Sequence, residues 1–268
     1  MSTEAAPTNE PILKREDREG VAWLTLNRPE AFNSLSTTLM TEVHAELDRL
    51  ADDPSVRVIV IAGSGRGFCA GHDLHEVRGN QDDPAFLDAM LKQCSAMMQA
   101  IVHHPKPIIA RVHGIATAAG CQLVASCDLA IAEEGARFGT PGVNIGLFCH
   151  TPMVALSRNV SRKHAMEMLL TGEMVGTDDA IRFGLINRAV PTAELDDAVM
   201  ALAQRIATKS SYTLKVGKEA FYRQMESPAL DGAYDYASKV MLENLKARDA
   251  EEGIQAFIDK RAPVWEDR

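Results

Sequence analysis

Apolar side chains alternate along the first half of the chain between short continuous runs and helical repeats. The runs Val58–Ala62 and Pro107–Val112 have the length and composition of strands that are buried on both faces. The segment Thr37–Leu50 instead repeats its apolar residues at helical spacing, and Ser36 or Thr37 can cap its start. These patterns predict strands that alternate with helices, which is typical of an α/β domain.

Weaker patterns extend this alternation to the neighbouring segments. The expected strands are Ile12–Arg15, Val21–Leu26 and a segment around Leu129–Ala132, with a turn at Glu16–Gly20 between the first two. The expected helices are Phe86–Val102 and the short apolar segment Cys121–Ala125.

Beyond Gly184 the pattern becomes almost entirely helical. The expected helices are Glu194–Lys209, Ser211–Arg223, Ala233–Lys246 and Asp249–Lys260. The last part of the chain is too small for an independent core, so we expect it to pack on its own body or on another subunit. We therefore predict a disordered N-terminus over 1–10, an α/β core over 11–209 and a helical C-terminal region over 210–268.

The charge balance and the cysteines limit the classes of ligand and compartment. A net charge of −9 over 268 residues argues against nucleic acid as a partner, because nucleic-acid binding needs a basic face. Five cysteines without a C-x-x-C pair are not a disulfide framework, and they favour a reducing compartment. No metal-ligand spacing and no membrane-length apolar stretch is present. We expect a cytoplasmic protein that has no metal site and no contact with a membrane.

Two loops rich in small residues each follow a predicted buried strand, and they are the candidate sites of chemistry. The first loop spans Gly63–Gly71, and Ala70 replaces the last glycine of a dinucleotide-binding G-x-G-x-x-G motif. The second loop spans His113–Gln122 and leads into a short helix, where backbone N–H groups lack intrahelical partners. Either loop alone could be a simple tight turn. Together they favour a ligand site.

Two motifs in these loops resemble the oxyanion-hole motifs of the crotonase (enoyl-CoA hydratase/isomerase) superfamily, namely Phe68–Leu74 (FCAGHDL) and His113–Leu123 (HGIATAAGCQL). The resemblance continues in the family's order from Leu26–Asn33 to Phe257–Arg261. It implies a spiral of β-β-α units with an α-helical C-terminal region for trimerisation, assembled as a homotrimer or a dimer of trimers. It also implies an acyl-CoA thioester as the ligand. Coenzyme A then arrives as part of the substrate, and no separate cofactor is expected.

The resemblance also implies roles for individual residues. By position, the backbone N–H groups of His72 and Ala119 form the oxyanion hole, which holds the thioester oxygen as it gains charge in an enolate. Phe257 and Lys260 match positions that reach the nucleotide end of CoA, often from a neighbouring subunit. Without the resemblance, the favoured interpretation is that Phe257 packs in the core and that Lys260 is a solvated cation at a helix end. The other expected substrate- and CoA-binding residues are Arg28, Ala31, Asn33, Ala70, Gly71, Asp73 and Leu74.

The sequence departs from a hydratase at the two positions where the family carries water-activating glutamates. Gln122 and Gly142 stand there instead. Gln122 can orient a water molecule or a carbonyl but cannot exchange a proton near neutral pH, and Gly142 would leave open space. His150 is an alternative base because histidine titrates near neutrality, or it caps the helix that begins near Thr151.

These residues leave several activities open. The chain is similar to the enoyl-CoA hydratase domain-containing proteins of the third type, and also to methylmalonyl-CoA decarboxylases, in which loss of CO2 forms the enolate without a base. We expect a lyase or isomerase of the hydratase/isomerase group, with ordinary hydratase activity doubtful. The alternatives are a decarboxylase or thioesterase on the same site, or a non-catalytic acyl-CoA-binding protein. If only the carboxylates are lacking, installing both glutamates should raise hydration of crotonyl-CoA.

Overall fold

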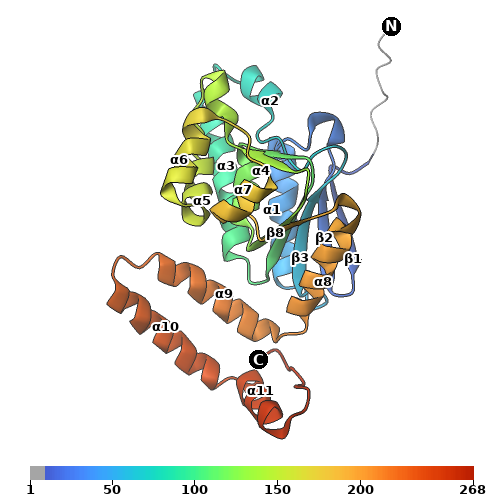
Figure 1. Cartoon of the computed structure of the whole chain (residues 1–268), viewed down its shortest axis with the longest axis vertical. Coiled ribbons are helices and arrows are strands. Elements are labelled where there is room, and N and C mark those ends of the chain that lie inside the picture. The colour runs from blue at the N-terminus through green and yellow to red at the C-terminus, as the bar shows by residue number, and fades with distance from the viewer. Residues whose placement is uncertain (1–9) are drawn as a thin grey trace.

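The computed structural model describes residues 10–268, so all of the expected disordered segment 1–10 except Glu10 lies outside the described residues. A six-stranded sheet in the order β1-β2-β3-β4-β6-β8 forms its centre (Figure 1). Only the first pair, β1 with β2, is antiparallel. The strands are β1 (Leu13–Arg18), β2 (Val21–Leu26), β3 (Val58–Gly63), β4 (Ile108–Val112), β6 (Leu129–Glu133) and β8 (Arg188–Val190).

Helices cover both faces of this sheet because its central strands are apolar on both sides. In β3, Ile59 and Ile61 belong to the larger core, while Val58 and Val60 belong to the core on the opposite face. The larger core is closed by α1 (Thr37–Ala51), α3 (Pro84–His103) and α4 (Ala119–Ser126), and the opposite core by α8 (Leu195–Ala207). The alternation predicted from the apolar runs is therefore confirmed.

A second, two-stranded parallel sheet pairs β5 (Ile115–Thr117) with β7 (Arg137–Gly139). Cys69 extends it through a bridge to Ala116. One strand of the large sheet, one strand of the small sheet and a helix follow one another twice along the chain. The first such unit is β4, β5 and α4, and the second is β6, β7 and α5 (Pro152–Asn159). This order confirms the expected β-β-α spiral and brings the loop after β3 against the loop after β4.

Several short elements differ from the predictions. Strand β1 continues to Arg18, and the turn is limited to Glu19 and Gly20, which both have positive φ angles in a two-residue hairpin. Strand β8 adds an edge to the sheet in a region expected to be almost wholly helical. The helices α2 (Leu74–Gly79), α6 (Arg162–Thr171) and α7 (Thr177–Phe183), and the 3-10 turns η1 (Pro29–Ala31), η2 (Pro141–Ile145) and η3 (Thr192–Glu194), were not assigned from the sequence.

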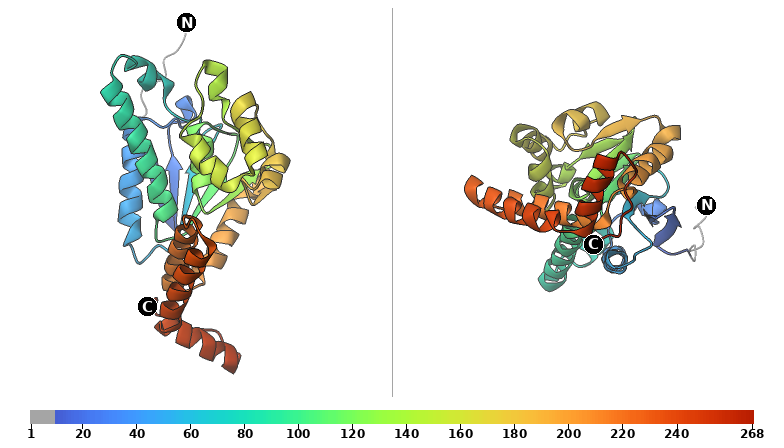
Figure 2. Two further views of the ribbon diagram at one scale, coloured as in Figure 1. Left: turned by 90° about the vertical axis from the view of Figure 1, so that its left-hand side faces the viewer. Right: turned by 90° about the horizontal axis from the view of Figure 1, so that it is seen from below.

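The C-terminal helices α9 (Ser211–Met225), α10 (Leu230–Leu245) and α11 (Arg248–Asp259) project from one end of the body (Figures 1 and 2). Many of their large apolar side chains are exposed, among them Leu230, Tyr234 and Phe257. Among the described residues, no helix is both long and apolar enough to cross a membrane.

Candidate functional site

The two loops are joined directly by backbone hydrogen bonds. The N–H groups of Phe68 and Cys69 donate to the Ile115 carbonyl oxygen at 3.0 and 3.1 Å, and the Thr117 N–H donates to the Cys69 carbonyl oxygen at 3.0 Å. The Thr117 hydroxyl donates to the Ala70 carbonyl oxygen at 2.9 Å. These bonds fix the first loop beside the start of α4.

Small residues are required where the loops meet. A Cβ added at Gly120 would lie 2.1 Å from the Cys69 carbonyl oxygen, so only glycine allows α4 to approach the first loop this closely. A Cβ added at Gly71 would lie 3.2 Å from the Ala119 nitrogen. Gly71 precedes His72, so this contact places the backbone at His72 near the backbone at Ala119.

The N–H groups of His72 and Ala119 donate to no acceptor within residues 10–268. Ala119 is the first residue of α4, and its N–H therefore has no intrahelical partner. The preceding residue, Ala118, adopts φ 49° and ψ −118°, a strained conformation for a residue other than glycine, and its side chain does not cap the helix. The Ala118 N–H donates to the Gly139 carbonyl oxygen at 2.9 Å and holds this turn in place.

The imidazole of His72 is an additional feature of this loop. A backbone bridge to Leu35 holds the His72 backbone, since the Leu35 N–H donates to Gly71 and the Asp73 N–H donates to the Leu35 carbonyl oxygen. Both ring nitrogens of His72 are buried without a partner among the described residues. Burial lowers the pKa of His72, which favours the neutral imidazole.

Arg28 and Asp73 brace the loops. The Arg28 guanidinium donates to the Asp73 carboxylate at 2.8 Å and to the Ser34 carbonyl oxygen at 2.7 Å. Asp73 also caps α2 by accepting from the His75 N–H at 3.0 Å. Burial acts to raise the pKa of Asp73, but Arg28 and the helix N–H groups outweigh it and hold the pKa below its usual value. Both expected binding residues therefore have their charges satisfied within the protein.

Asn33 also supports the first loop from inside. It is fully buried, and its amide nitrogen donates at 2.8 Å to the carbonyl oxygens of both Ser64 and Gly67. Its amide oxygen accepts from the Arg28 N–H at 2.9 Å. Ala31 ends the 3-10 turn η1, and the Ala70 N–H donates to the Phe32 carbonyl oxygen at 2.9 Å.

The remaining expected CoA contacts are exposed. Leu74, the first residue of α2, is 55% exposed next to the loops. Phe257 is 85% exposed, and Lys260 is the left-handed cap of α11. Helix α11 lies at the opposite end of the molecule from α2 (Figure 1), so a single chain does not bring Phe257 and Lys260 to the loops.

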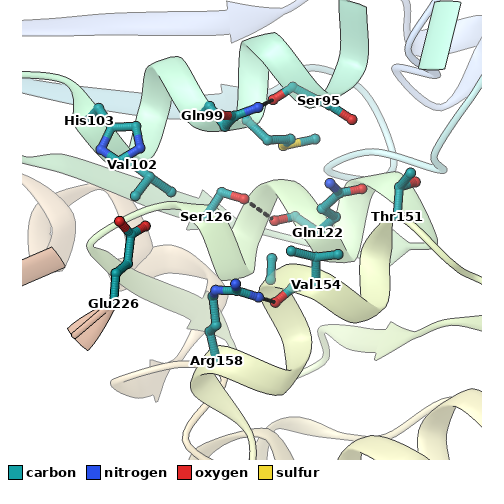
Figure 3. A pocket seen from close by; sticks show the side chains of 12 residues that line it. Ser95, Gln99, Val102, His103, Gln122, Ser126, Thr151, Val154, Arg158 and Glu226 are labelled. Carbon is teal, nitrogen blue, oxygen red and sulfur yellow. Dashed lines mark hydrogen bonds between the residues drawn. The ribbon is translucent and has the colours of Figure 1, made fainter. Parts of the chain in front are cut away.

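Gln122 lies one helical turn after Ala119 and faces a cavity of about 330 Å³ between α3, α4, α5 and the end of α9 (Figure 3). The side chain is buried, and its carbonyl oxygen has no hydrogen-bond partner among the described residues. A buried amide without a partner is costly, so this position suits a ligand or water that supplies a donor.

The space expected at Gly142 is absent. An added Cβ would lie 2.5 Å from the Leu147 carbonyl oxygen and 2.9 Å from the Cys149 sulfur. The segment folds back on itself because the Leu147 N–H donates to the Gly142 carbonyl oxygen at 2.9 Å. The expectation that Gly142 leaves room is therefore wrong, and a glutamate at this position requires the backbone at Leu147 to move.

His150 is exposed, and its ring packs against Phe148 with a centroid distance of 5.2 Å. It is not the cap of α5: the cap is Thr151, and no side chain there accepts a capping hydrogen bond. His150 does not line the cavity beside Gln122. Its geometry therefore gives no specific support to a role as base.

Sequence reasoning missed several side chains near this site. The Arg66 guanidinium stacks over the Phe32 ring at 5.0 Å on the first loop, and it forms no ion pair within the described part of the chain. The cavity also includes residues of α3, α5 and α9, such as His103, Arg158 and Glu226. Of these cavity residues, Ser126 could have been predicted from the sequence, because it lies four residues after Gln122 and therefore on the same face of α4.

The chain is similar to known proteins over nearly its whole length. A family model described as enoyl-CoA hydratase/isomerase matches residues 16–268. Enoyl-CoA hydratase domain-containing protein 3, mitochondrial, from Rattus norvegicus is 43% identical over 97% of this chain and 87% of its own length. A crystal structure of enoyl-CoA hydratase from Mycobacterium smegmatis has a TM-score of 0.92 at 49% identity, covering 96% of this chain and 99% of that one. The human domain-containing protein 3 has a TM-score of 0.91 at 42% identity, covering 95% and 100%.

These comparisons correct the expected location. Relatives that are 42–43% identical over most of the chain are named as mitochondrial, which points away from the predicted cytoplasmic location. The prediction was wrong because it used unpaired cysteines and composition. Those features indicate a reducing compartment but do not distinguish one such compartment from another.

Proposed function

We propose that this chain, which belongs to the enoyl-CoA hydratase/isomerase family, binds an acyl-CoA thioester and stabilises its enolate with the N–H groups of His72 and Ala119. One observation carries this proposal: two backbone N–H groups from loops that meet at Gly71 have no acceptor within residues 10–268, and Gln122, on the helix that Ala119 begins, lines a cavity. Neither group needs to reorganise when negative charge develops on a thioester oxygen. Each such donor typically contributes about 3 kcal/mol to the transition state.

Gln122 limits the chemistry that follows. Its amide can hold a water molecule or a hydroxyl group next to the acyl chain, but it cannot remove a proton. Gly142 has no side chain that could carry a second proton, and the nearby Leu147 carbonyl oxygen leaves no room for one. We therefore propose a lyase or isomerase of the hydratase/isomerase group with slow hydration of a simple enoyl-CoA.

Binding and turnover should be measured on the same preparation. Calorimetry with acetoacetyl-CoA tests the thioester site, and crotonyl-CoA absorbance tests hydration. We expect micromolar binding with hydration well below the usual enzyme median of about 10 per second. Absence of acetoacetyl-CoA binding would overturn the proposed function, while fast hydration would overturn the assignment of Gln122 as a residue that does not transfer protons.

Decarboxylation is the second candidate, and the missing proton carriers favour it. When the bond between Cα and a carboxylate breaks, CO2 leaves and the electron pair becomes the enolate in the same oxyanion hole. A proton from water then forms a new Cα–H bond in place of the Cα–carboxylate bond, and the hydroxide that remains combines with CO2 as bicarbonate. This sequence needs no base at residue 122 or 142. Release of CO2 from malonyl-CoA or methylmalonyl-CoA tests it, and no release above the uncatalysed rate would exclude it.

A further inference from the structure

The cavity beside Gln122 has polar side chains at both ends, and between them apolar side chains are mixed with Ser95, Gln99 and Ser126 (Figure 3). Its apolar wall is formed by Met98, Val102, Val154 and Ala155. Gln122 and Thr151 lie toward one side, and His103, Glu226 and Arg158 lie toward the other. Its volume of about 330 Å³ is within the range of small-molecule sites. This arrangement suits a short chain of methylene groups with a polar group at its far end.

Helix α4 connects this cavity to the oxyanion loops. Gln122 lies three residues after Ala119, a rise of about 4.5 Å along the helix. The Gln122 side chain is only 5% exposed, and its carbonyl oxygen is unpartnered within residues 10–268. Ser126, one further turn along, also lines the cavity. Gln122 therefore lines the cavity from the same helix whose first N–H, at Ala119, belongs to the proposed thioester site.

Arg158 supplies a positive charge at the far end. One of its nitrogens donates to the Val154 carbonyl oxygen at 3.0 Å, which leaves its other N–H groups available. In the part of the chain that the structure describes, Arg158 forms no ion pair, although Glu226 lines the same cavity. A guanidinium stays charged at all working pH values and can bind a carboxylate through two parallel hydrogen bonds.

We infer that the acyl group carries a carboxylate at the end distant from the thioester, and that Arg158 is the specificity-determining residue that binds it. This inference rests on the proposed function, because the thioester must first occupy the oxyanion loops. The methylene groups between the two ends pack on Met98 and Val154. Glu226 lies at the same end, and its negative charge opposes the substrate carboxylate.

The test compares two thioesters of equal chain length, glutaryl-CoA and pentanoyl-CoA, by calorimetry. We expect glutaryl-CoA to bind wild-type protein about tenfold more tightly, as one charged hydrogen-bonded contact provides. Arg158→Gln should remove this preference, and Glu226→Gln should strengthen binding of glutaryl-CoA alone. Arg162→Gln is the matched control, because Arg162 starts α6 and does not line the cavity.

Each outcome separates this inference from the proposed function. Equal affinities in the wild-type protein, or a preference that survives Arg158→Gln, would overturn the carboxylate assignment and leave the acyl-CoA site intact. Binding of neither thioester would overturn both. Tighter binding of 4-aminobutyryl-CoA than of glutaryl-CoA would assign the cavity to a cation held by Glu226. If Arg158→Gln fails to fold, the wild-type comparison still tests the carboxylate preference, and unchanged glutaryl-CoA affinity in Glu226→Gln would contradict its placement at the Arg158 end of the cavity.

Discussion

The family resemblance predicts that Gly142 and Gln122 stand where hydratases carry glutamate, and the structure indicates that the two positions tolerate substitution differently. A methyl group at Gly142 meets the Leu147 carbonyl oxygen, whereas Gln122 and glutamate have nearly the same shape. We predict that Gly142→Ala lowers the free energy of unfolding by about 1–3 kcal/mol, as overpacking of a tight site does. Gln122→Glu should lower it less. Urea unfolding followed by circular dichroism measures both, and a Gly142→Ala variant as stable as wild type would contradict the steric argument.

This difference changes the expectation for the double glutamate variant. From the sequence alone, installing both carboxylates is expected to raise hydration of crotonyl-CoA if only the carboxylates are lacking. Because the backbone at Leu147 must move first, we now expect Gln122→Glu and Gly142→Glu together to disturb the segment rather than to activate water. That Gln122 and Gly142 replace the two glutamates of a hydratase stays a prediction from the family resemblance. The sequence does not reveal the folded-back segment, since that depends on the hydrogen bond from the Leu147 N–H to the Gly142 carbonyl oxygen.

His104 is a buried residue whose protonation should weaken the fold. Its Nε2 lies 3.0 Å from the Leu47 carbonyl oxygen, and its Nδ1 accepts from the Lys106 N–H at 3.1 Å. This pattern needs the neutral ring, and burial chiefly lowers the pKa of His104. The unfolded chain, with a histidine pKa near 6.5, then binds the proton more readily. The stability is fully present above about pH 6.5 and is lost as the pH falls below it.

We predict that His104→Gln makes unfolding less dependent on pH between 7.5 and 5.5. One titrating histidine can change the free energy of unfolding by up to about 1.4 kcal/mol per pH unit. His72 and His113 also have pKa values lowered by burial, so part of the dependence should remain. Urea unfolding at the two pH values measures the effect. A decline in the variant equal to that of the wild type would exclude His104 as a source.

At the scale of elements, one buried ion pair attaches α9 to the body. The Lys218 ammonium donates to the Asp128 carboxylate at 2.7 Å and to the carbonyl oxygens of Ile101 and Lys106 at 3.1 Å. The Tyr222 hydroxyl donates to the other Asp128 oxygen at 2.9 Å. These contacts set where α9 ends, and therefore where Glu226 lies beside the cavity.

We predict that Lys218→Met lowers the free energy of unfolding by about 3 kcal/mol, because it leaves the Asp128 charge buried without its main partner. Adding Asp128→Asn should recover part of this loss. Lys215→Met, an exposed lysine on the same helix, is the control and should change little. Urea unfolding measures all of these variants. An effect of Lys218→Met no larger than that of Lys215→Met would show that the pair does not hold α9.

Sequence patterns predicted two kinds of element well. One is a helix whose apolar residues repeat at helical spacing over several turns, such as α1, and the other is a strand with a continuous apolar run, such as β3. The missed helices α6 and α7 are short, and each buries only three residues, so they carry little amphipathic signal. The three-residue strand β8 is recognisable only beside its partner β6. The cavity likewise cannot be recognised without knowing which elements lie side by side, because its walls come from helices that are distant in the sequence.

At the scale of the whole molecule, the C-terminal helices expose large apolar side chains that would be buried in an assembly of several chains. Exposed apolar side chains of α10 include Tyr234, Met241 and Leu245, and Phe257 on α11 is 85% exposed. Exposed large apolar side chains in this number are typical of an interface, and the family resemblance implies a trimer or a dimer of trimers. In such an assembly, Phe257 and Lys260 could reach the CoA site of a neighbouring subunit.

We predict that the native mass is three or six times the 29.2 kDa of one chain. Met241 and Leu245 lie one turn apart on α10 and are 57% and 50% exposed, so replacing both with aspartate should place repelling charges in the interface. Light scattering should then report smaller particles, and calorimetry should report weaker binding of acetoacetyl-CoA because Phe257 and Lys260 are withdrawn. Glu243→Gln on the same helix is the control. A wild-type protein that is monomeric at micromolar concentration would contradict the prediction, and undiminished CoA affinity in a dissociated variant would place the whole binding site within one chain.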